Sequence, residues 1–123
     1  EPRALIVEEP EAHLHPELQR LLTRAFVKMV RRGMQLILTT HSDYLLYGLS
    51  NLIELSARPE VGHELGYMEG EALKPDKVAA YLVKAEGRRA VLTGLKVTEE
   101  GIPEDEFVEV AGELAEERSR LLP

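Results

Sequence analysis

Two short apolar runs, separated by one helix-length segment, most constrain how this chain can fold. The first run covers residues 4–7 (Ala-Leu-Ile-Val) and the second covers residues 34–40. Continuous apolar runs of this length are typical of strands that are buried on both faces of a parallel sheet. Residues 17–32, between them, repeat apolar side chains at helical spacing and end at Gly33, a natural helix cap. The pattern predicts a strand–helix–strand unit of an α/β fold with a parallel sheet.

The helix between the two runs has an apolar face and a basic face. We expect the apolar face to be buried. It consists of Leu18, Leu21, Leu22, Ala25, Phe26, Met29 and Val30. The basic face consists of Arg20, Arg24, Lys28 and Arg31. A basic stripe of this kind is usually a solvated helix face, although it also suits a phosphate backbone.

A second helix is expected directly after the second apolar run. Ser42 or Asp43 is placed to cap its first turn. Its predicted buried face consists of Leu45, Leu46, Leu49, Leu52 and Ile53. The next segment, residues 58–76, contains two prolines and three glycines, which predicts mostly loop.

The C-terminal part of the chain carries a hairpin signal and a helix signal. Residues 78–84 and 89–97 are two β-type stretches on either side of Glu86-Gly87. Pro103 then opens a helix with Glu104, Asp105 and Glu106 in its first turn. The apolar face of this helix consists of Phe107, Val110, Ala111, Leu114 and Leu121. We expect the hairpin and the helix to pack against the α/β lobe.

Net charge, cysteine content and the length of apolar runs limit the classes of protein to which the chain can belong. The chain has a net charge of −7, and residues 61–123 carry 8 basic and 14 acidic side chains. An acidic second half argues against a general nucleic-acid surface there. The chain has no cysteine, which excludes disulfides and thiolate zinc sites. With no apolar run near the roughly 20 residues of a membrane helix, we expect a cytoplasmic protein without membrane contact.

Two adjacent carboxylates, Glu8 and Glu9, stand at the end of the first predicted strand, directly before Pro10. Neighbouring carboxylates repel each other, and a cation is the usual compensation. The carboxyl ends of parallel strands are also where α/β sheets place their ligands. The bland alternative is that both glutamates are solvated loop residues.

The run Leu5-Ile6-Val7-Glu8-Glu9-Pro10-Glu11-Ala12-His13-Leu14-His15-Pro16 resembles the Walker B strand and D-loop of the ABC/SMC superfamily of ATPases. It is most similar to the predicted ATPases related to the overcoming-lysogenisation-defect and RecF-like proteins. The later run Leu36-Ile37-Leu38-Thr39-Thr40-His41-Ser42 resembles the strand and switch histidine (H-loop) that follow in that family. Both elements occur in the family's order and are separated by one helix.

The resemblance implies a role for each of three residues. Glu8 stands at the position that helps to hold Mg²⁺, usually through the water shell of the ion. The superfamily generally has aspartate there, so the longer glutamate implies a more indirect contact. Glu9 stands at the position that orients or deprotonates the attacking water. His41 stands at the position that contacts the γ-phosphate of ATP.

Residues 11–15 correspond to the D-loop, which in this superfamily lies along the seam between two ATPase heads. On this basis Glu11, His13, His15 and Ser42 are expected at the edge of the nucleotide site. The three glutamates and the His-x-His pattern are also ligand types for zinc or manganese. A metallohydrolase that uses Glu8, Glu9, His13 and His15 is therefore a second interpretation, although it does not account for His41.

The chain lacks a G-x-x-x-x-G-K-[S/T] phosphate loop. It also lacks the signature motif and glutamine loop of the family, which precede Walker B. Since the chain begins at Glu1 inside a predicted strand, we expect that the upstream part of the domain has been removed. The resemblance then predicts that residues 1–57 are the C-terminal part of an ABC-type ATPase core, 58–76 a linker, and 77–123 a hairpin–helix extension of the same domain.

These observations predict a partial P-loop NTPase lobe of the ABC head type, which binds and hydrolyses ATP with Mg²⁺ in the intact protein. Without the phosphate loop, this chain alone is expected to be inactive. The resemblance implies a homodimer of heads and a DNA or nuclease partner. The alternative from another class is a non-catalytic dimerisation or interaction module that keeps the motifs as relics.

Overall fold

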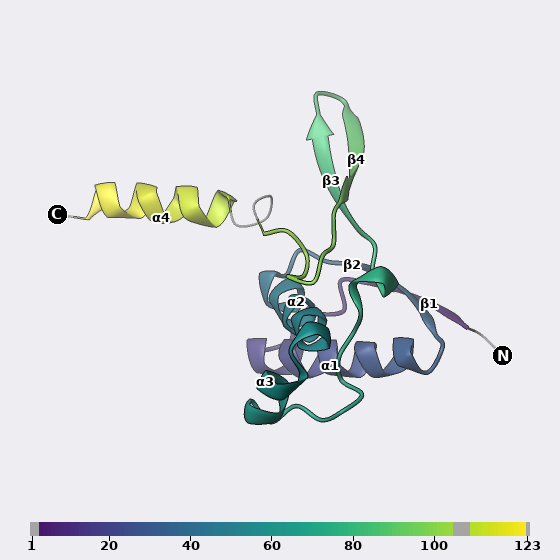
Figure 1. Ribbon diagram of the computed structural model, residues 1–123. Helices are drawn as coiled ribbons and strands as arrows, with labels where there is room; N and C mark the ends of the chain where they lie inside the picture. The colour runs from purple at the N-terminus through teal and green to yellow at the C-terminus, as the bar shows by residue number, and fades with distance from the viewer. Residues whose placement is uncertain (1–2, 105–108, 123) are drawn as a thin grey trace.

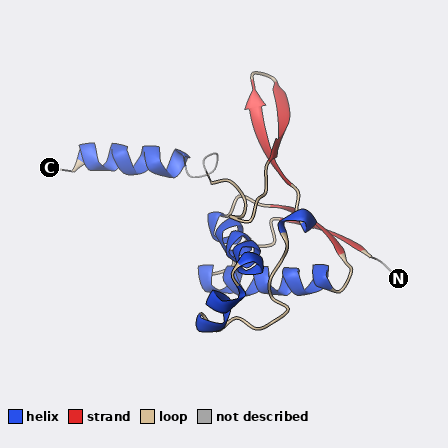
Figure 2. Ribbon diagram, in the orientation of Figure 1, coloured by secondary structure: helices blue, strands red, loops and turns tan. Residues whose placement is uncertain are grey.

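The computed structural model describes residues 3–104 and 109–122 of the 123-residue chain (Figure 1). Helices form most of the body, and a β-hairpin and the last helix project from it (Figure 2). The elements follow in the order β1 (Ala4–Glu8), α1 (Pro16–Arg31), β2 (Gln35–Thr39), α2 (Asp43–Ala57), α3 (Pro59–Glu64), the 3-10 turn η1 (Pro75–Lys77), β3 (Ala80–Glu86), β4 (Arg89–Leu95) and α4 (Glu109–Leu121).

The predicted strand–helix–strand unit is confirmed. Strands β1 and β2 pair in parallel, with Ala4 opposite Gln35 and Glu8 opposite Thr39. The prediction that both strands are buried on two faces is wrong for this chain, because Ile6 keeps 69% of its side-chain surface exposed and Ile37 is also exposed. Among the described residues the sheet has only these two strands, so much of its apolar surface has no neighbour.

The helix α1 forms where the sequence predicts it, but it is rotated relative to the predicted buried face. Leu18 and Leu21 are exposed, whereas Gln19 and Thr23 are buried together with Phe26 and Val27. Thr23 faces Gly48 of α2, and a methyl group at Gly48 would lie 3.0 Å from the Thr23 side chain. The small residues let the two helices approach closely, and the periodicity of α1 alone does not carry this information.

The core of the molecule lies between α1 and α2 and the segments that cross them. Its buried apolar residues are Val27, Leu52, Ile53, Leu55, Leu73 and Ile102. The predicted face of α2 is confirmed, since Leu45, Leu52 and Ile53 are fully buried and Leu46 and Leu49 pack at the edge of the core.

The segment predicted as mostly loop, residues 58–76, contains the short helix α3 and is otherwise irregular apart from η1. It is held firmly on the body. The Leu73 N–H donates to the Leu52 carbonyl at 3.0 Å, and the Leu73 side chain enters the core. The division of the chain into three sequence parts stays a prediction.

The basic face of α1 fixes this segment. Arg24 forms an ion pair with the buried carboxylate of Glu71 at 2.6 Å, and Lys28 lies 3.9 Å from the same carboxylate. Arg31 donates to the Ala72 carbonyl at 2.7 Å. The basic face is largely exposed, as expected. Three of its four residues nevertheless also contact a segment more than 40 positions away in the sequence.

The predicted hairpin and terminal helix both form, but the helix does not pack against the lobe. Strands β3 and β4 pair antiparallel from Ala80–Leu95 to Glu86–Arg89. The chain then returns to α2, where the Ile102 N–H donates to Ser50 Oγ at 3.0 Å. Beyond this contact α4 extends away from the body (Figure 1), and residues 112–122 are all exposed. The predicted helix residues Asp105, Glu106 and Phe107, and the side chains of Val110 and Ala111, lie outside the described part.

Candidate nucleotide site

The candidate site lies at the edge of the parallel sheet where β1 and β2 both end. Glu8 is the last residue of β1 and is in register with Thr39, the last residue of β2. The Glu9 N–H continues the ladder by one step and donates to the Thr39 carbonyl at 2.8 Å. The first catalytic candidate is therefore anchored to the second strand by its own backbone, at the edge where α/β sheets bind ligands.

The loop that follows β1 has an unusual backbone. Glu9 has φ of 45° and His13 has φ of 64°, and they are the two non-glycine residues with positive φ in the described chain. Non-glycine residues rarely adopt this region, and such strain concentrates at functional sites. Two backbone hydrogen bonds stabilise the loop, from the Ala12 N–H to the Glu9 carbonyl at 3.0 Å and from the Leu14 N–H to the Glu11 carbonyl at 2.9 Å.

The structure brings Glu9 and His41 together. Glu9 Oε1 lies 3.4 Å from His41 Nε2, although the two residues are 32 positions apart in the sequence. Both side chains face solvent, with 91% of the histidine and 55% of the carboxylate surface exposed. The pair is thus open to an incoming ligand, and an acceptor and an imidazole stand side by side at the end of the sheet.

Glu11 joins the two loops of the site. Its Oε1 accepts from Thr40 Oγ1 at 2.6 Å and from the His41 N–H at 3.2 Å. Burial alone would raise the pKa of Glu11, but the hydrogen bonds from Thr40 and from backbone N–H groups outweigh it and lower the pKa below its usual value. The second oxygen, Oε2, is buried, and no described residue donates a hydrogen bond to it. Glu11 therefore fixes the position of the backbone that carries His41.

Ser42 and His15 cap the two helices that flank the site. The Ser42 hydroxyl accepts from the Leu45 N–H at 3.2 Å and donates to Gln19 Oε1. Gln19 Nε2 in turn donates to the Leu14 carbonyl at 3.0 Å, which ties the loop after β1 to the start of α2. His15 Nδ1 accepts from the Glu17 N–H at 3.3 Å. The structure thus shows capping contacts for both residues, and their role in binding a nucleotide stays a prediction.

Glu8 and His13 stand at the rim. Both side chains are exposed, and no hydrogen bond or ion pair engages the Glu8 carboxylate within residues 3–104 and 109–122. A shallow hollow of about 390 Å³ is lined by Glu11, Gln19, His41, Ser42, Asp43 and Tyr44, and neither Glu8 nor His13 lines it. Within the described chain no three His, Cys, Asp or Glu side chains converge on a metal-binding point. The metallohydrolase interpretation therefore finds no support in the geometry.

Sequence reasoning missed two residues of the site, Gln19 and Thr40. Gln19 occupies a position that the helical pattern assigns to the solvent side of α1, yet it is buried. Thr40 lies inside the second motif, but nothing in the pattern shows that its hydroxyl reaches Glu11 across 29 positions. A polar residue at an unexpected helical phase was the one available signal for Gln19.

The geometry agrees with the comparisons to known proteins. Residues 1–46, which include β1, α1, β2 and the loop with His41, match the protein family described as "AAA domain, putative AbiEii toxin, Type IV TA system". The chain is also 27% identical over 107 residues to the energy-coupling factor transporter ATP-binding protein EcfA2 of three Streptococcus agalactiae strains, of serotypes Ia, V and III. The chain is similar to the ATP-binding domains of P-loop ATPases.

The similarity is partial in extent. The match to the transporter ATP-binding proteins covers 80% of this chain and 38% of their length, so the chain spans well under half of these relatives. No solved structure gives a significant match. Within the described residues, no helix is both long and apolar enough to span a membrane. The cytoplasmic location stays a prediction.

Proposed function

We propose that this chain is the Walker B and switch-histidine part of an ABC/SMC-like ATPase head, and that Glu9 and His41 act on ATP in the intact protein. The observation that carries the proposal is the 3.4 Å approach of Glu9 Oε1 to His41 Nε2 at the open edge of the parallel sheet. A carboxylate in this position accepts a proton from a water or orients it, and an imidazole beside it donates to a phosphoryl oxygen.

The surrounding contacts suit the proposed roles of Glu9 toward water and of His41 toward phosphate. Glu9 is held by its own backbone hydrogen bond to β2, so its carboxylate is not needed to hold the loop and faces both His41 and solvent. His41 is held through its N–H by Glu11, so its imidazole faces Glu9 and solvent. Catalysis of phosphoryl transfer depends mainly on positioning and electrostatics. Here a backbone hydrogen bond positions Glu9, and the Glu11 carboxylate positions His41.

Mg²⁺ fits the exposed carboxylate of Glu8. The ion keeps most of its waters and binds through one or two carboxylates together with substrate phosphates. Glu8 and the adjacent Glu9 end one strand, and no described cation neutralises Glu8. When bound there, Mg²⁺ would offset the charge of the ATP phosphates.

The phosphates themselves need a second set of residues. No glycine-rich phosphate loop occurs in these 123 residues, and the chain covers 38% of its curated relatives. We therefore propose that the chain alone neither binds ATP tightly nor hydrolyses it. In the intact protein two heads would sandwich ATP, with residues 11–15 at their seam. ATP hydrolysis would open and close the pair of heads and so drive a partner, either DNA or a nuclease that acts on DNA.

Steady-state phosphate release tests the proposal. The protein that joins this chain to its phosphate loop should hydrolyse ATP, and Glu9→Gln should lower kcat by about 10²- to 10⁴-fold, the usual range for removing a general base. ATP binding should persist in the variant, because the phosphate loop supplies most of the affinity. The isolated 123-residue chain should release phosphate at the background rate.

Glu60→Gln is the matched control, since Glu60 is an exposed glutamate of α3 and lies outside the site. It should leave kcat unchanged. Turnover that survives Glu9→Gln would contradict the proposed role of Glu9. Absence of turnover in the unmodified protein with its phosphate loop would contradict the ATPase proposal and favour the alternative of a non-catalytic interaction module. Turnover by the isolated chain, lost on Glu9→Gln, would overturn the claim that this chain is inactive alone.

A further inference from the structure

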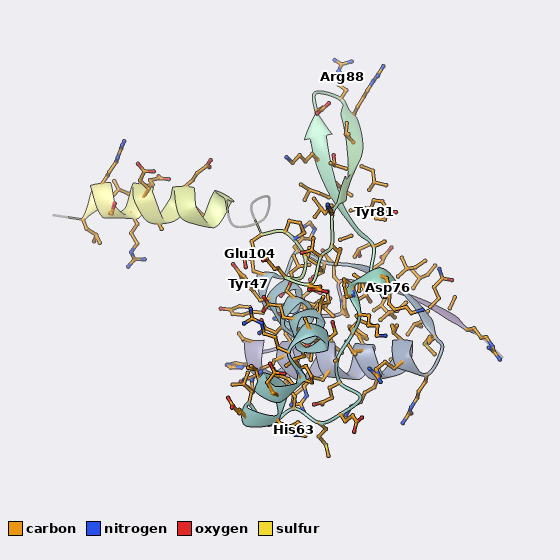
Figure 3. The ribbon with its side chains drawn as sticks, in the orientation of Figure 1. Tyr47, His63, Asp76, Tyr81, Arg88 and Glu104 are labelled. Atoms are coloured by element: carbon orange, nitrogen blue, oxygen red, sulfur yellow. The ribbon has the colours of Figure 1, made fainter. Side chains whose placement is uncertain are left out.

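One face of the projecting hairpin is entirely apolar and uncovered. Side chains alternate between the two faces of a strand, and opposite residues of a pair share a face. The register therefore gathers three pairs on one side, namely Tyr81–Gly94, Val83–Leu92 and Ala85–Ala90. All six residues are exposed, with 66% of Val83 and 64% of Leu92 open to solvent. Figure 3 shows Tyr81 at the side of the hairpin near its base and Arg88 at its tip.

The helix α4 presents a second uncovered apolar surface. Leu114 and Leu121 are seven residues apart and lie on the same side of the helix, with Leu122 beside them. Leu114 is 60% exposed, and the other two are also exposed. The helix extends away from its own hairpin in Figure 1, so neither apolar surface covers the other within the described chain.

The two surfaces match in length, and the tip of the hairpin is opposite in charge to α4. A seven-residue strand spans about 23 Å, and a 13-residue helix spans about 20 Å. The tip of the hairpin is basic, with Arg88 in the turn and Arg89 next to it, whereas α4 carries four glutamates against two arginines. Lys84, Glu86 and Arg89 belong to the face opposite the apolar one. A two-stranded hairpin is marginally stable in water until a helix or further strands cover its apolar face. The apolar face of the hairpin is thus not covered by any described helix. The helix α4 of the same chain is acidic and has an uncovered apolar side.

We propose that α4 of one copy packs on the Tyr81–Val83–Leu92 face of a second copy, and that the exchange is reciprocal. Such an arrangement is a two-fold dimer in which each copy contributes a helix to the other. The outward direction of α4 favours a second copy over its own hairpin. The glutamates of α4 would lie near the basic tip formed by Arg88 and Arg89. This interface is separate from the nucleotide site, so the dimer would form without ATP.

Cross-linking between two labelled populations tests the exchange. The chain has no cysteine, so Val83→Cys and Leu114→Cys each introduce a unique thiol at an exposed position that the fold tolerates. The Val83→Cys chain, labelled with ¹⁵N, is mixed with the unlabelled Leu114→Cys chain without nucleotide and treated with a short bismaleimide. We expect a mixed product of twice 13.8 kDa. It should exceed the control pair at least about tenfold, since the docked thiols are at millimolar effective concentration.

The control pair is Thr93→Cys with Glu116→Cys. Thr93 faces the opposite side of the hairpin, and Glu116 lies about 200° around the helix from Leu114. A yield no higher than that of the control pair would overturn the proposal. An intramolecular link in the Val83→Cys/Leu114→Cys chain, without the mixed product, would also overturn it, because α4 would then cover its own hairpin.

Sedimentation equilibrium gives a second readout that does not depend on thiol chemistry. The unmodified chain should be a dimer at micromolar concentration without nucleotide. Leu114→Lys places a charge in the proposed interface and should yield monomers. Ser119→Lys adds the same charge at an exposed position about 140° around the helix from Leu114 and should leave the dimer intact. A monomeric unmodified chain would contradict the exchange and would leave the proposed ATPase role unaffected.

Discussion

The helical body and the two sheets of this molecule bury very different amounts of apolar surface. In the body, Leu45, Leu52 and Ile53 are fully buried between α1, α2 and the segment around Leu73. In both sheets, by contrast, apolar side chains such as Ile6 and Val83 remain largely exposed. Because burial of apolar surface is the main favourable term in folding, the body must supply most of the stability of the chain.

The difference in apolar burial separates the residues that stabilise the fold from those that form uncovered surface. The body fixes the first turns of α1 and α2, and these turns position the loops of the candidate site. The sheets present surfaces that the described chain does not cover, at the β1–β2 pair and at the hairpin. Buried core and uncovered apolar surface therefore lie in separate parts of one short chain, and substitutions in the two parts should have different effects.

The largest expected effect is at the centre of the body. Leu52→Ala removes a fully buried side chain and should lower the free energy of unfolding by about 3 kcal/mol. Leu92→Ala in the hairpin should lower it by about 0.5 kcal/mol or less, because Leu92 is already exposed. Urea denaturation measures both. Each variant is made in the Leu114→Lys background, so that association does not contribute.

Equal losses of unfolding free energy in Leu52→Ala and Leu92→Ala would contradict the difference between the helical body and the hairpin. A loss at Leu92 as large as that at Leu52 would mean that the hairpin face is buried within a single chain. The m-value provides an internal control, since it should stay constant if the unfolded states are alike.

The ion pair between the body and the 65–74 segment should give the next largest effect. Glu71→Gln removes the charge that Arg24 and Lys28 face and should cost about 2 kcal/mol at pH 7, less than a fully buried pair because Arg24 is partly exposed. Burial acts to raise the pKa of Glu71, but hydrogen bonds from the Met68 N–H and Arg24 lower it below 4.5.

The sign of the pH dependence follows from that lowered pKa. Since the folded-state pKa lies below the unfolded value, the stabilisation is fully present above the unfolded value and is lost as the pH falls through the folded one. The gap in stability between the unmodified chain and Glu71→Gln should therefore shrink below about pH 4.5. Glu69→Gln, at an exposed glutamate nearby, should show no such gap at any pH.

Local patterns predicted the elements of the fold well, but not the contacts between them. The bounds of β1, α1 and β2 agree with the sequence reading within one or two residues, because apolar runs and caps are local signals. The predicted buried face of α1 was only partly right, since Phe26 is buried but Leu18 and Leu21 are exposed. The actual face includes Thr23, whose burial depends on Gly48 of α2, and the sequence of α1 alone does not carry this information. The position of α4 was wrong for a related reason, since an apolar stripe predicts burial without naming the surface that covers it.

The candidate site shows the same limit. The motifs bring Glu9 and His41 to the same edge of a parallel sheet, and the structure places them 3.4 Å apart. The role of Glu11 as the link between the two loops could not be read from the sequence, because it depends on a hydrogen bond to Thr40 across 29 positions. The assignment of the individual site residues to nucleotide binding stays a prediction.

Apart from the Leu92→Ala control, the smallest expected effect on stability is at the link formed by Glu11. Glu11→Gln keeps an acceptor for Thr40 and the His41 N–H but replaces charge-assisted hydrogen bonds by neutral ones, a loss of about 1 kcal/mol. Amide hydrogen exchange should then speed up at His41 while the amides of α2 beyond Leu45 keep their protection, because the core below the site is unchanged. Exchange that speeds up throughout α2 would show that the site loops support the body. Unchanged exchange at His41 would show that Glu11 does not fix the histidine loop, and would remove the argument that the body positions His41 through this carboxylate.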